Sequence, residues 1–286
     1  MKRILLLGVL IVLACASCRD TRIKEHNSWK QYFDKYGIRN GCFIMTDHTH
    51  EAVHLYNKER CLQRFLPAST FKIFNSLVAL ETATAQDETL LIPWDSIKRG
   101  PQWDKPMTMK EAFKTSNIGY YQELARRIGA QDMQHFLDTV KYGNMKMGKH
   151  IDSFWVDNSL QISADEQVGF LKRLYFEQLP FTLRTQTIVR SIMLQQDSAD
   201  NKLYYKTGWG HLPNGKDILW VVGFLEHSEE FKEHKNSMNK SDKRNYPYIF
   251  ALNFEIDRND QSRNWMEARI NLLNDLLNDF GAYKTP

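Results

Sequence analysis

A serine and a lysine spaced three residues apart are the first side chains in this chain that could do chemistry together. Ser69 and Lys72 follow Pro67 and precede an apolar run, so the spacing predicts one face at the start of a helix. A serine hydroxyl becomes a nucleophile when a neutral amine takes its proton. The outward-pointing N–H groups of a helix N-terminus also favour negative charge beside that hydroxyl. The pair therefore predicts a nucleophilic serine with a lysine as its base.

A Lys-Thr-Gly sequence at residues 206–208 is the second candidate. Lys206 supplies a point charge for an anionic substrate group, and Gly208 lets a ligand lie close against a strand. Strict alternation would send Lys206 and Thr207 to opposite faces of a sheet. Both reach one ligand only at an exposed edge, so the motif predicts an edge strand that lines a cleft. The alternative is an ordinary solvated strand end.

Hydrophobic periodicity places these two motifs in different kinds of structure. Apolar spacing predicts a helix capped by Asn27 or Ser28, a helix over 67–80 and a last helix over 266–280. Ser116 is expected to cap a further helix. β-Branched and aromatic residues predict strands over 41–46, 52–56, 203–210, 219–225 and 248–256. The polar stretch 227–247 is expected to be a solvated loop.

The order of these elements predicts an α/β (α+β) fold. Strands and terminal helices at both ends of the chain enclose a mostly helical middle. This order indicates an antiparallel sheet assembled from residues 24–66 and 180–286 and flanked by the N- and C-terminal helices. Residues 67–179 are expected to form an inserted helical subdomain, so that residues 24–286 make one unit.

The start of the chain has the pattern of an export signal. Two basic residues precede an apolar run over 4–14, and small residues follow it. Residues 1–18 are therefore expected to direct the chain to the periplasm and to be removed. Cys15 and Cys18 are alternative lipid anchors if the signal is of the lipoprotein type.

Composition argues against several other classes of protein. The 286 residues are 42% hydrophobic and carry a formal net charge of +4 spread along the chain, which disfavours disorder and nucleic-acid binding. No apolar run is long enough for a membrane span. Beyond the export signal the sequence has no C-x-x-C pair and no H-E-x-x-H motif, so no metal site is expected. Cys42 and Cys61 are consistent with either a disulfide or two free thiols.

Two further short patterns change the interpretation when all four are taken in order. Pro67–Lys72 is followed by Ser116-Asn117-Ile118, by Tyr142-Gly143-Asn144 and by Lys206–Gly208. Together with Phe154-Trp155 and the residues before Ser69, these patterns resemble the penicillin-recognising serine enzymes, and among them the class D β-lactamases (oxacillinases). The resemblance covers roughly residues 28–282.

The resemblance implies a mechanism. Ser69 would attack the β-lactam carbonyl, and Lys72 would serve as general base after carbon dioxide carboxylates its amine to N6-carboxylysine. Trp155 would donate a hydrogen bond to that carbamate, since an indole N–H only donates. Ser116 would relay a proton to the leaving nitrogen, and the backbone N–H groups of Ser69 and Trp209 would form the oxyanion hole. No cofactor is implied besides carbon dioxide or bicarbonate.

The resemblance also implies how a small-molecule β-lactam substrate is held. Lys206 and Thr207 would bind its carboxylate together with an arginine, for which Arg269 fits better than Arg258 or Arg263. Gly208 would lie against the substrate. Further residues expected to shape the cleft or to keep the Lys72 amine in apolar surroundings are Phe71, Phe74, Trp103, Ile118 and Leu160.

Three alternatives share parts of this pattern. A penicillin-binding transpeptidase would share Ser69, Lys72 and Lys206 but more often has an asparagine where this chain has Ile118. A non-hydrolytic β-lactam sensor domain would form the acyl-enzyme without releasing it. A non-enzymatic α/β protein would carry the motifs by accident. Turnover of the acyl-enzyme separates these alternatives, and the sequence is compatible with both a monomer and a homodimer.

Overall fold

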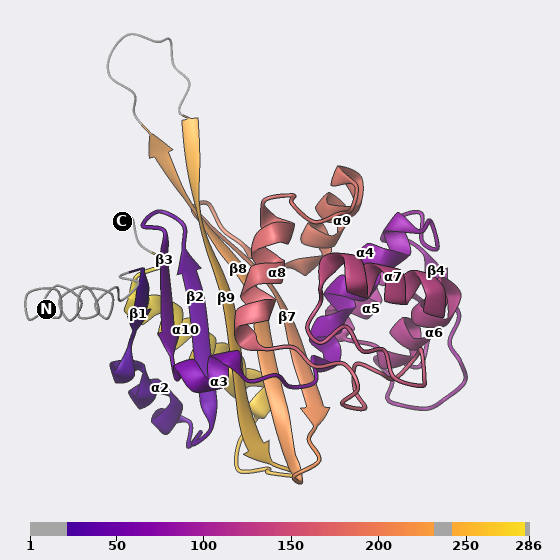
Figure 1. The fold of residues 1–286 in the computed structure, drawn as a ribbon, viewed down its shortest axis with the longest axis horizontal. Coiled ribbons are helices and arrows are strands. Elements are labelled where there is room, and N and C mark those ends of the chain that lie inside the picture. Colours follow the sequence, from indigo (N-terminus) through magenta and orange to yellow (C-terminus); the bar gives the residue numbers. More distant parts are fainter. Residues whose placement is uncertain (1–21, 232–241, 284–286) are drawn as a thin grey trace, which may run out of the picture.

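A seven-stranded sheet forms the centre of the computed structural model, which describes residues 22–231 and 242–283 (Figure 1). The strands lie in the order β1-β3-β2-β9-β8-β7-β6, with β1 parallel to β3 and every other neighbouring pair antiparallel. Their bounds are β1 (Ile23–Glu25), β2 (Gly41–Asp47), β3 (Ala52–Tyr56), β6 (Leu194–Asp197), β7 (Asn201–His211), β8 (Lys216–Phe231) and β9 (Asp242–Asp257). Because β2 pairs with β9, the two ends of the chain build one sheet, as predicted. The predicted export segment lies outside the described residues.

Helices cover both faces of this sheet (Figure 1). On one face α10 (Trp265–Phe280), α2 (Lys30–Lys35) and the 3-10 turn η1 (Asn27–Trp29) enclose an apolar core with the strands. On the other face α8 (Ala164–Tyr175) packs on β9 and joins the core of the helical part. A sheet covered on both faces needs apolar residues in both directions, which explains why Ile249 through Leu252 are all fully buried.

The inserted part of the chain is mostly helical. Its elements are η2 (Ala68–Phe71), α4 (Lys72–Glu81), β4 (Leu91–Ile92), β5 (Met107–Thr108), α5 (Met109–Thr115), α6 (Ile118–Ile128), α7 (Ala130–Val140), α8 and α9 (Leu183–Met193), and a short α3 (Lys58–Leu62) precedes them. Every residue of α4 from Lys72 to Leu80 is buried, polar ones included. A helix buried on all sides lies at the centre of its domain, so the lysine at the start of α4 is surrounded by protein.

The predicted loop over 227–247 is wrong. β8 continues to Phe231, β9 begins at Asp242, and their register is unbroken from Lys216↔Asp257 to Phe231↔Asp242. Residues 226–231 and 242–247 form a two-stranded ribbon that projects beyond the rest of the sheet (Figure 1). Polar residues are accommodated here because backbone pairing continues from the buried hairpin and depends on main-chain groups rather than on side-chain type. Within the predicted loop, residues 232–241 lie outside the described residues, so the prediction is not tested there.

Two predicted helix caps are also wrong. The N-terminal helix begins as the 3-10 turn η1, whose N-cap is His26 and has no side-chain cap bond. Ser116 ends α5 in the left-handed conformation, and Asn117 caps α6 by accepting a hydrogen bond from the Tyr120 N–H. The sequence places several polar residues at each boundary, and local spacing alone does not choose among them.

Two further features concern cysteines and membranes. Cys42 and Cys61 are free and buried, and the neighbouring Cys42 together with burial raises the pKa of the Cys61 thiol.

In the described part of the chain, no helix combines the length and the hydropathy needed to cross a membrane.

Candidate active site

The predicted serine and lysine lie in direct contact at the start of the central helix. Ser69 lies on η2, and Lys72 is the first residue of α4. Lys72 Nζ donates a hydrogen bond to Ser69 Oγ at 2.8 Å. Only 1% of Lys72 is exposed, and burial lowers the pKa of its amine to about 7. The structure therefore pairs the hydroxyl with an amine that is substantially neutral near neutral pH, as a base must be.

Backbone hydrogen bonds hold the nucleophile segment against the loop before α8. Phe65 and Ile162 exchange two backbone hydrogen bonds, at 3.0 and 2.8 Å. The Ala68 N–H donates to the Trp155 carbonyl at 3.0 Å. Ala68 itself has a φ of +48°, a strained value for a residue with a side chain. These anchors, at Phe65 and at Ala68 itself, fix where the next residue, Ser69, presents its hydroxyl.

A buried polar network beneath the serine was not predicted as part of the site. Thr70 Oγ1 donates to the Pro67 carbonyl at 2.8 Å, and Gln167 Nε2 donates to Thr70 Oγ1 at 2.9 Å. Arg64 and Glu166 form an ion pair nearby. The sequence signal was present, since these residues belong to the stretches that resemble the class D enzymes, but a hydrogen bond between residues 97 positions apart is visible only in the fold.

The Lys-Thr-Gly motif lies on a strand edge, as predicted. β6 pairs with β7 only as far as Tyr204, so the outer edge of β7 is uncovered from Lys206 onward. Lys206 Nζ donates to Ser116 Oγ at 3.1 Å, which brings the second and fourth motifs together across 90 residues. Ser116 reaches this position because its left-handed backbone, with φ of 59°, turns the chain between α5 and α6.

Lys206 is buried near two other basic side chains, Lys72 and Arg269. It is 4% exposed, and burial lowers the pKa of its amine well below the ordinary value, with further lowering from Lys72 and Arg269. Its second hydrogen bond goes to the Thr207 carbonyl at 3.1 Å. An incoming carboxylate would favour the protonated form of this amine, because an opposite charge offsets both the desolvation of the ammonium and the repulsion from Lys72 and Arg269.

Two glycines bring β7 against the nucleophile segment. A Cβ on Gly208 would lie 3.0 Å from the Pro67 carbonyl oxygen, and one on Gly210 would lie 3.2 Å from the Ala68 Cβ. Trp209 lies between them, and its indole N–H donates to Asp217 at 2.8 Å. The close approach brings the β7 backbone on either side of Trp209 against Pro67 and Ala68, which precede Ser69.

Arg269 is the arginine that reaches the strand. It is 4% exposed and donates to the Gly208 carbonyl at 3.0 Å, and burial lowers its pKa to about 10. Arg258 instead bonds to Asp217 and to the Leu212 carbonyl. Arg263 lies over the Trp265 ring at 5.1 Å. Of the three predicted arginines, only Arg269 is in contact with the Lys-Thr-Gly strand.

Trp155 is buried beside the serine and lysine. It is 1% exposed and stacks on Phe71 with ring centroids 5.2 Å apart. Phe71, Phe74 and Leu160 are fully buried in the same core, which agrees with the predicted apolar surroundings, whereas Ile118 is half-buried. The hydrogen bonds of the described residues include none from the Trp155 indole N–H, so this donor is free for another acceptor.

The Tyr-Gly-Asn element positions the loop that carries Leu160. Asn144 Nδ2 donates to the Ser159 carbonyl at 2.8 Å, and Asn144 Oδ1 accepts from the Gln161 N–H at 3.1 Å. Tyr142 is buried against Phe71 and Phe74. The element therefore fixes the loop on both sides of Leu160 and packs against the helix that begins with Lys72.

Replacing Gly143 by alanine is expected to lower the free energy of unfolding by about 3 kcal/mol, because strain and overlap add. Gly143 has a φ of +55°, and a Cβ there would overlap the Gln161 carbonyl oxygen. Gly281→Ala is the matched control, since Gly281 has a φ of +84° with open space around it, and should cost about 1 kcal/mol. Urea unfolding of both variants tests this, and equal losses would contradict the overlap.

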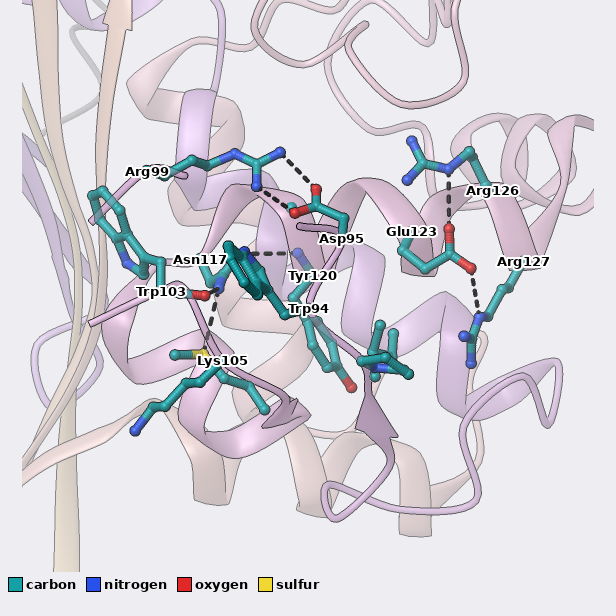
Figure 2. Close-up of a pocket in the computed structure, with 14 residues that line it drawn as sticks. Trp94, Asp95, Arg99, Trp103, Lys105, Asn117, Tyr120, Glu123, Arg126 and Arg127 are labelled. Carbon is teal, nitrogen blue, oxygen red and sulfur yellow. Dashed lines mark hydrogen bonds and ion pairs between the residues drawn. The ribbon is translucent and has the colours of Figure 1, made fainter. Parts of the chain in front are cut away.

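Trp103 bonds to the residues on either side of Ser116. Its indole N–H donates to the Thr115 carbonyl at 2.8 Å, and its own carbonyl accepts from Asn117 Nδ2 at 3.2 Å. Figure 2 shows it at the border of a cavity of about 250 Å³ that Trp94 and Tyr120 also line. Trp103 therefore supports the turn that carries Ser116, and the contacts of its side chain lie on the helical side of that turn.

Comparisons with known proteins find relatives with a similar sequence and a similar fold. A family model described as the penicillin binding protein transpeptidase domain matches residues 25–231. The β-lactamase OXA-5 of Pseudomonas aeruginosa is 31% identical over 260 residues, 90% of this chain and 91% of that protein. The crystal structure of the class D β-lactamase YbXI from Nostoc is 36% identical, with a TM-score of 0.78 over 90% of this chain and 99% of that one. The chain belongs to the class D β-lactamases.

A class D β-lactamase fold is shared with proteins named for another role. The C-terminal domain of the BlaR penicillin-receptor of Bacillus licheniformis has a TM-score of 0.79 over 93% of this chain and 99% of that one, at 24% identity. That likeness concerns the fold alone. Membership of the class D β-lactamases therefore rests on the more similar relatives and on the Ser69, Lys72, Ser116 and Lys206 cluster.

Proposed function

We propose that this protein hydrolyses the β-lactam amide bond of penicillins through an acyl-enzyme on Ser69, with a carboxylated Lys72 as general base. The observation that carries the proposal is the 2.8 Å hydrogen bond between the Ser69 hydroxyl and a buried lysine amine whose pKa burial lowers to about 7. A lysine held mostly protonated could neither take the serine proton nor react with carbon dioxide.

Acylation uses groups that the fold has already brought together. Lys72 takes the Ser69 proton as the serine oxygen bonds to the lactam carbonyl carbon. The backbone N–H groups of Ser69 and Trp209 stabilise the oxyanion, a contribution worth about 10²–10³ in rate for each donor. Ser116, hydrogen-bonded to Lys206 at 3.1 Å, gives a proton to the lactam nitrogen as the ring C–N bond breaks.

The surroundings of Lys72 fit a carbamate on its amine. Its neutral nitrogen can bond to the carbon of carbon dioxide and lose a proton, and the carbamate so formed would supply a general base for deacylation. Burial removes competing water, and the free indole N–H of Trp155 offers a donor. Lys206 is close enough to Lys72 that the charge of Lys72 lowers the pKa of the Lys206 amine, so the Lys206 amine is a second group near a carbamate. These residues, Trp155 and Lys206, are proposed to hold the base in place.

Intact-mass spectrometry after addition of benzylpenicillin tests the proposed function. With bicarbonate present we expect a transient adduct on Ser69 that disappears while penicillin is consumed, and no adduct on Ser69→Ala. A stable adduct would identify a β-lactam sensor or a transpeptidase-like protein with the same fold. The absence of any adduct would contradict the whole assignment.

The pH dependence of turnover is expected to follow the Lys72 amine. Below about pH 7 the amine gains a proton and can no longer react with carbon dioxide, so activity at limiting bicarbonate should fall as the pH falls through this value. Added bicarbonate should restore part of the loss, because it raises the supply of carbon dioxide. Steady-state rates at two bicarbonate concentrations across this range test the prediction, and a profile that bicarbonate does not change would contradict it.

A further inference from the structure

A cavity of about 180 Å³ lies at the Lys-Thr-Gly strand, between it and the helices α5 and α10. Lys206, Thr207 and Arg269 line its buried side, while Lys114 of α5 and Gln195 of β6 line the side nearer to solvent. Neither of the two catalytic serines lines it. The cavity therefore lies past the reacting centre, on the side where the substrate carboxylate is proposed to bind.

Among the described residues that line this cavity, the charged side chains are all basic: Lys114, Lys206 and Arg269. The two buried cations have neutral hydrogen-bond partners: Lys206 donates to a hydroxyl and a carbonyl oxygen, both at 3.1 Å, and Arg269 donates to a carbonyl oxygen at 3.0 Å. Arg269 Nε is buried without an acceptor among the described residues. Lys114 adds an exposed positive charge in the last turn of α5. Three basic side chains therefore line the cavity, and none of the described residues that line it is an aspartate or a glutamate.

One substrate carboxylate balances only part of this charge. The lactam carboxylate would lie between Lys206 and Arg269, where it supplies the anionic partner that neither buried group has among the described residues. A carbamate on Lys72 would offset a second positive charge from the other side. The ammonium of Lys114 then remains unbalanced at the open end of the cavity.

We propose that Lys114 and Gln195 form a second anion subsite, which takes a sulfonate or carboxylate carried on the ring substituent next to the lactam carboxylate. This inference rests on the proposed function. Gln195 Nε2 makes one long hydrogen bond to the Tyr205 carbonyl, at 3.4 Å, and its second N–H can donate to the anion. Met266, 58% exposed at the rim, offers an apolar contact for the ring that carries the charged group.

Two cephalosporins that differ by one sulfonate test this subsite. Cefonicid and cefamandole share their acyl side chain and a tetrazolylthiomethyl ring substituent, and only cefonicid carries a sulfonate on the tetrazole. We expect Lys114→Gln to lower the ratio of their acylation rates, cefonicid over cefamandole, by about threefold to tenfold at low salt. The effect should shrink at high salt, because exposed charges are screened.

Lys110→Gln is the matched control. Lys110 is an exposed lysine of the same helix that does not line the cavity, so its removal should leave the ratio unchanged. A ratio that Lys114→Gln leaves unchanged, or that Lys110→Gln changes equally, would overturn the subsite. Dissociation constants of both compounds for the Ser69→Ala enzyme, measured with and without Lys114→Gln, report the same preference without acylation. If Lys114→Gln does not lower the preference for cefonicid, or if neither compound binds, the second anion subsite is also contradicted.

Benzylpenicillin separates this inference from the proposed function. It has no second anionic group, so Lys114→Gln should change its turnover much less than the cephalosporin ratio. If the unmodified enzyme forms no adduct with benzylpenicillin, the proposed function itself fails. If benzylpenicillin is turned over and the cephalosporin ratio does not respond to Lys114→Gln, only the second anion subsite fails.

Discussion

Replacement of Lys72 by alanine is expected to leave penicillin-treated enzyme trapped as the acyl-enzyme on Ser69, with turnover lowered by about 10³-fold or more. Lys72 Nζ is the hydrogen-bond partner of the Ser69 hydroxyl in this structure, at 2.8 Å. Deacylation should suffer more than acylation, because water has no other base in the buried pocket, whereas the strained lactam ring assists its own opening. Stopped-flow acylation and intact-mass decay of the adduct measure the two steps separately.

Lys72→Met controls for the loss of packing in this prediction. Methionine keeps an unbranched side chain of similar length in a fully buried position, so α4 should remain folded while the base is removed. Both variants should lose the response to bicarbonate. Normal turnover by either variant would contradict the proposal that Lys72 is the base.

Replacement of Trp155 by phenylalanine is expected to slow deacylation by about 10²-fold. The phenyl ring retains most of the stacking on Phe71, which precedes Lys72, but the indole N–H is lost. Without that donor a carbamate on Lys72 is less stable, so more bicarbonate should be needed for half-maximal activity. The concentration of bicarbonate at half-maximal rate is the measurement, because a purely structural role for Trp155 would not change it.

Trp29→Phe is the matched control for Trp155. Trp29 is also fully buried and its indole N–H donates to Asp279 at 2.7 Å, but it packs with α10 on the opposite face of the sheet. Its replacement should cost stability and leave the bicarbonate requirement unchanged. An equal change in that requirement for both tryptophans would show that lost packing, rather than a lost donor at Lys72, is responsible.

Local spacing along the chain was enough to predict several parts of this enzyme. Ser69 and Lys72 are one helical turn apart, so their contact follows from the backbone geometry of residues 68–72 alone. Richness in β-branched and aromatic residues likewise located the inner parts of β7, β8 and β9, because strands covered on both faces carry apolar side chains in both directions. The order of elements then predicted the sheet built from both ends.

Only the tertiary structure decided how distant segments meet. Lys206 reaches Ser116 across 90 residues because β7 loses its neighbour β6 at that position, and Arg269 was selected from three arginines by its contact with Gly208. The polar residues 226–231 and 242–247 form strands because their register continues from the buried hairpin. The physical reason is common to these cases: spacing fixes contacts within a turn or a strand, whereas packing of the whole chain fixes which buried cations share one cleft.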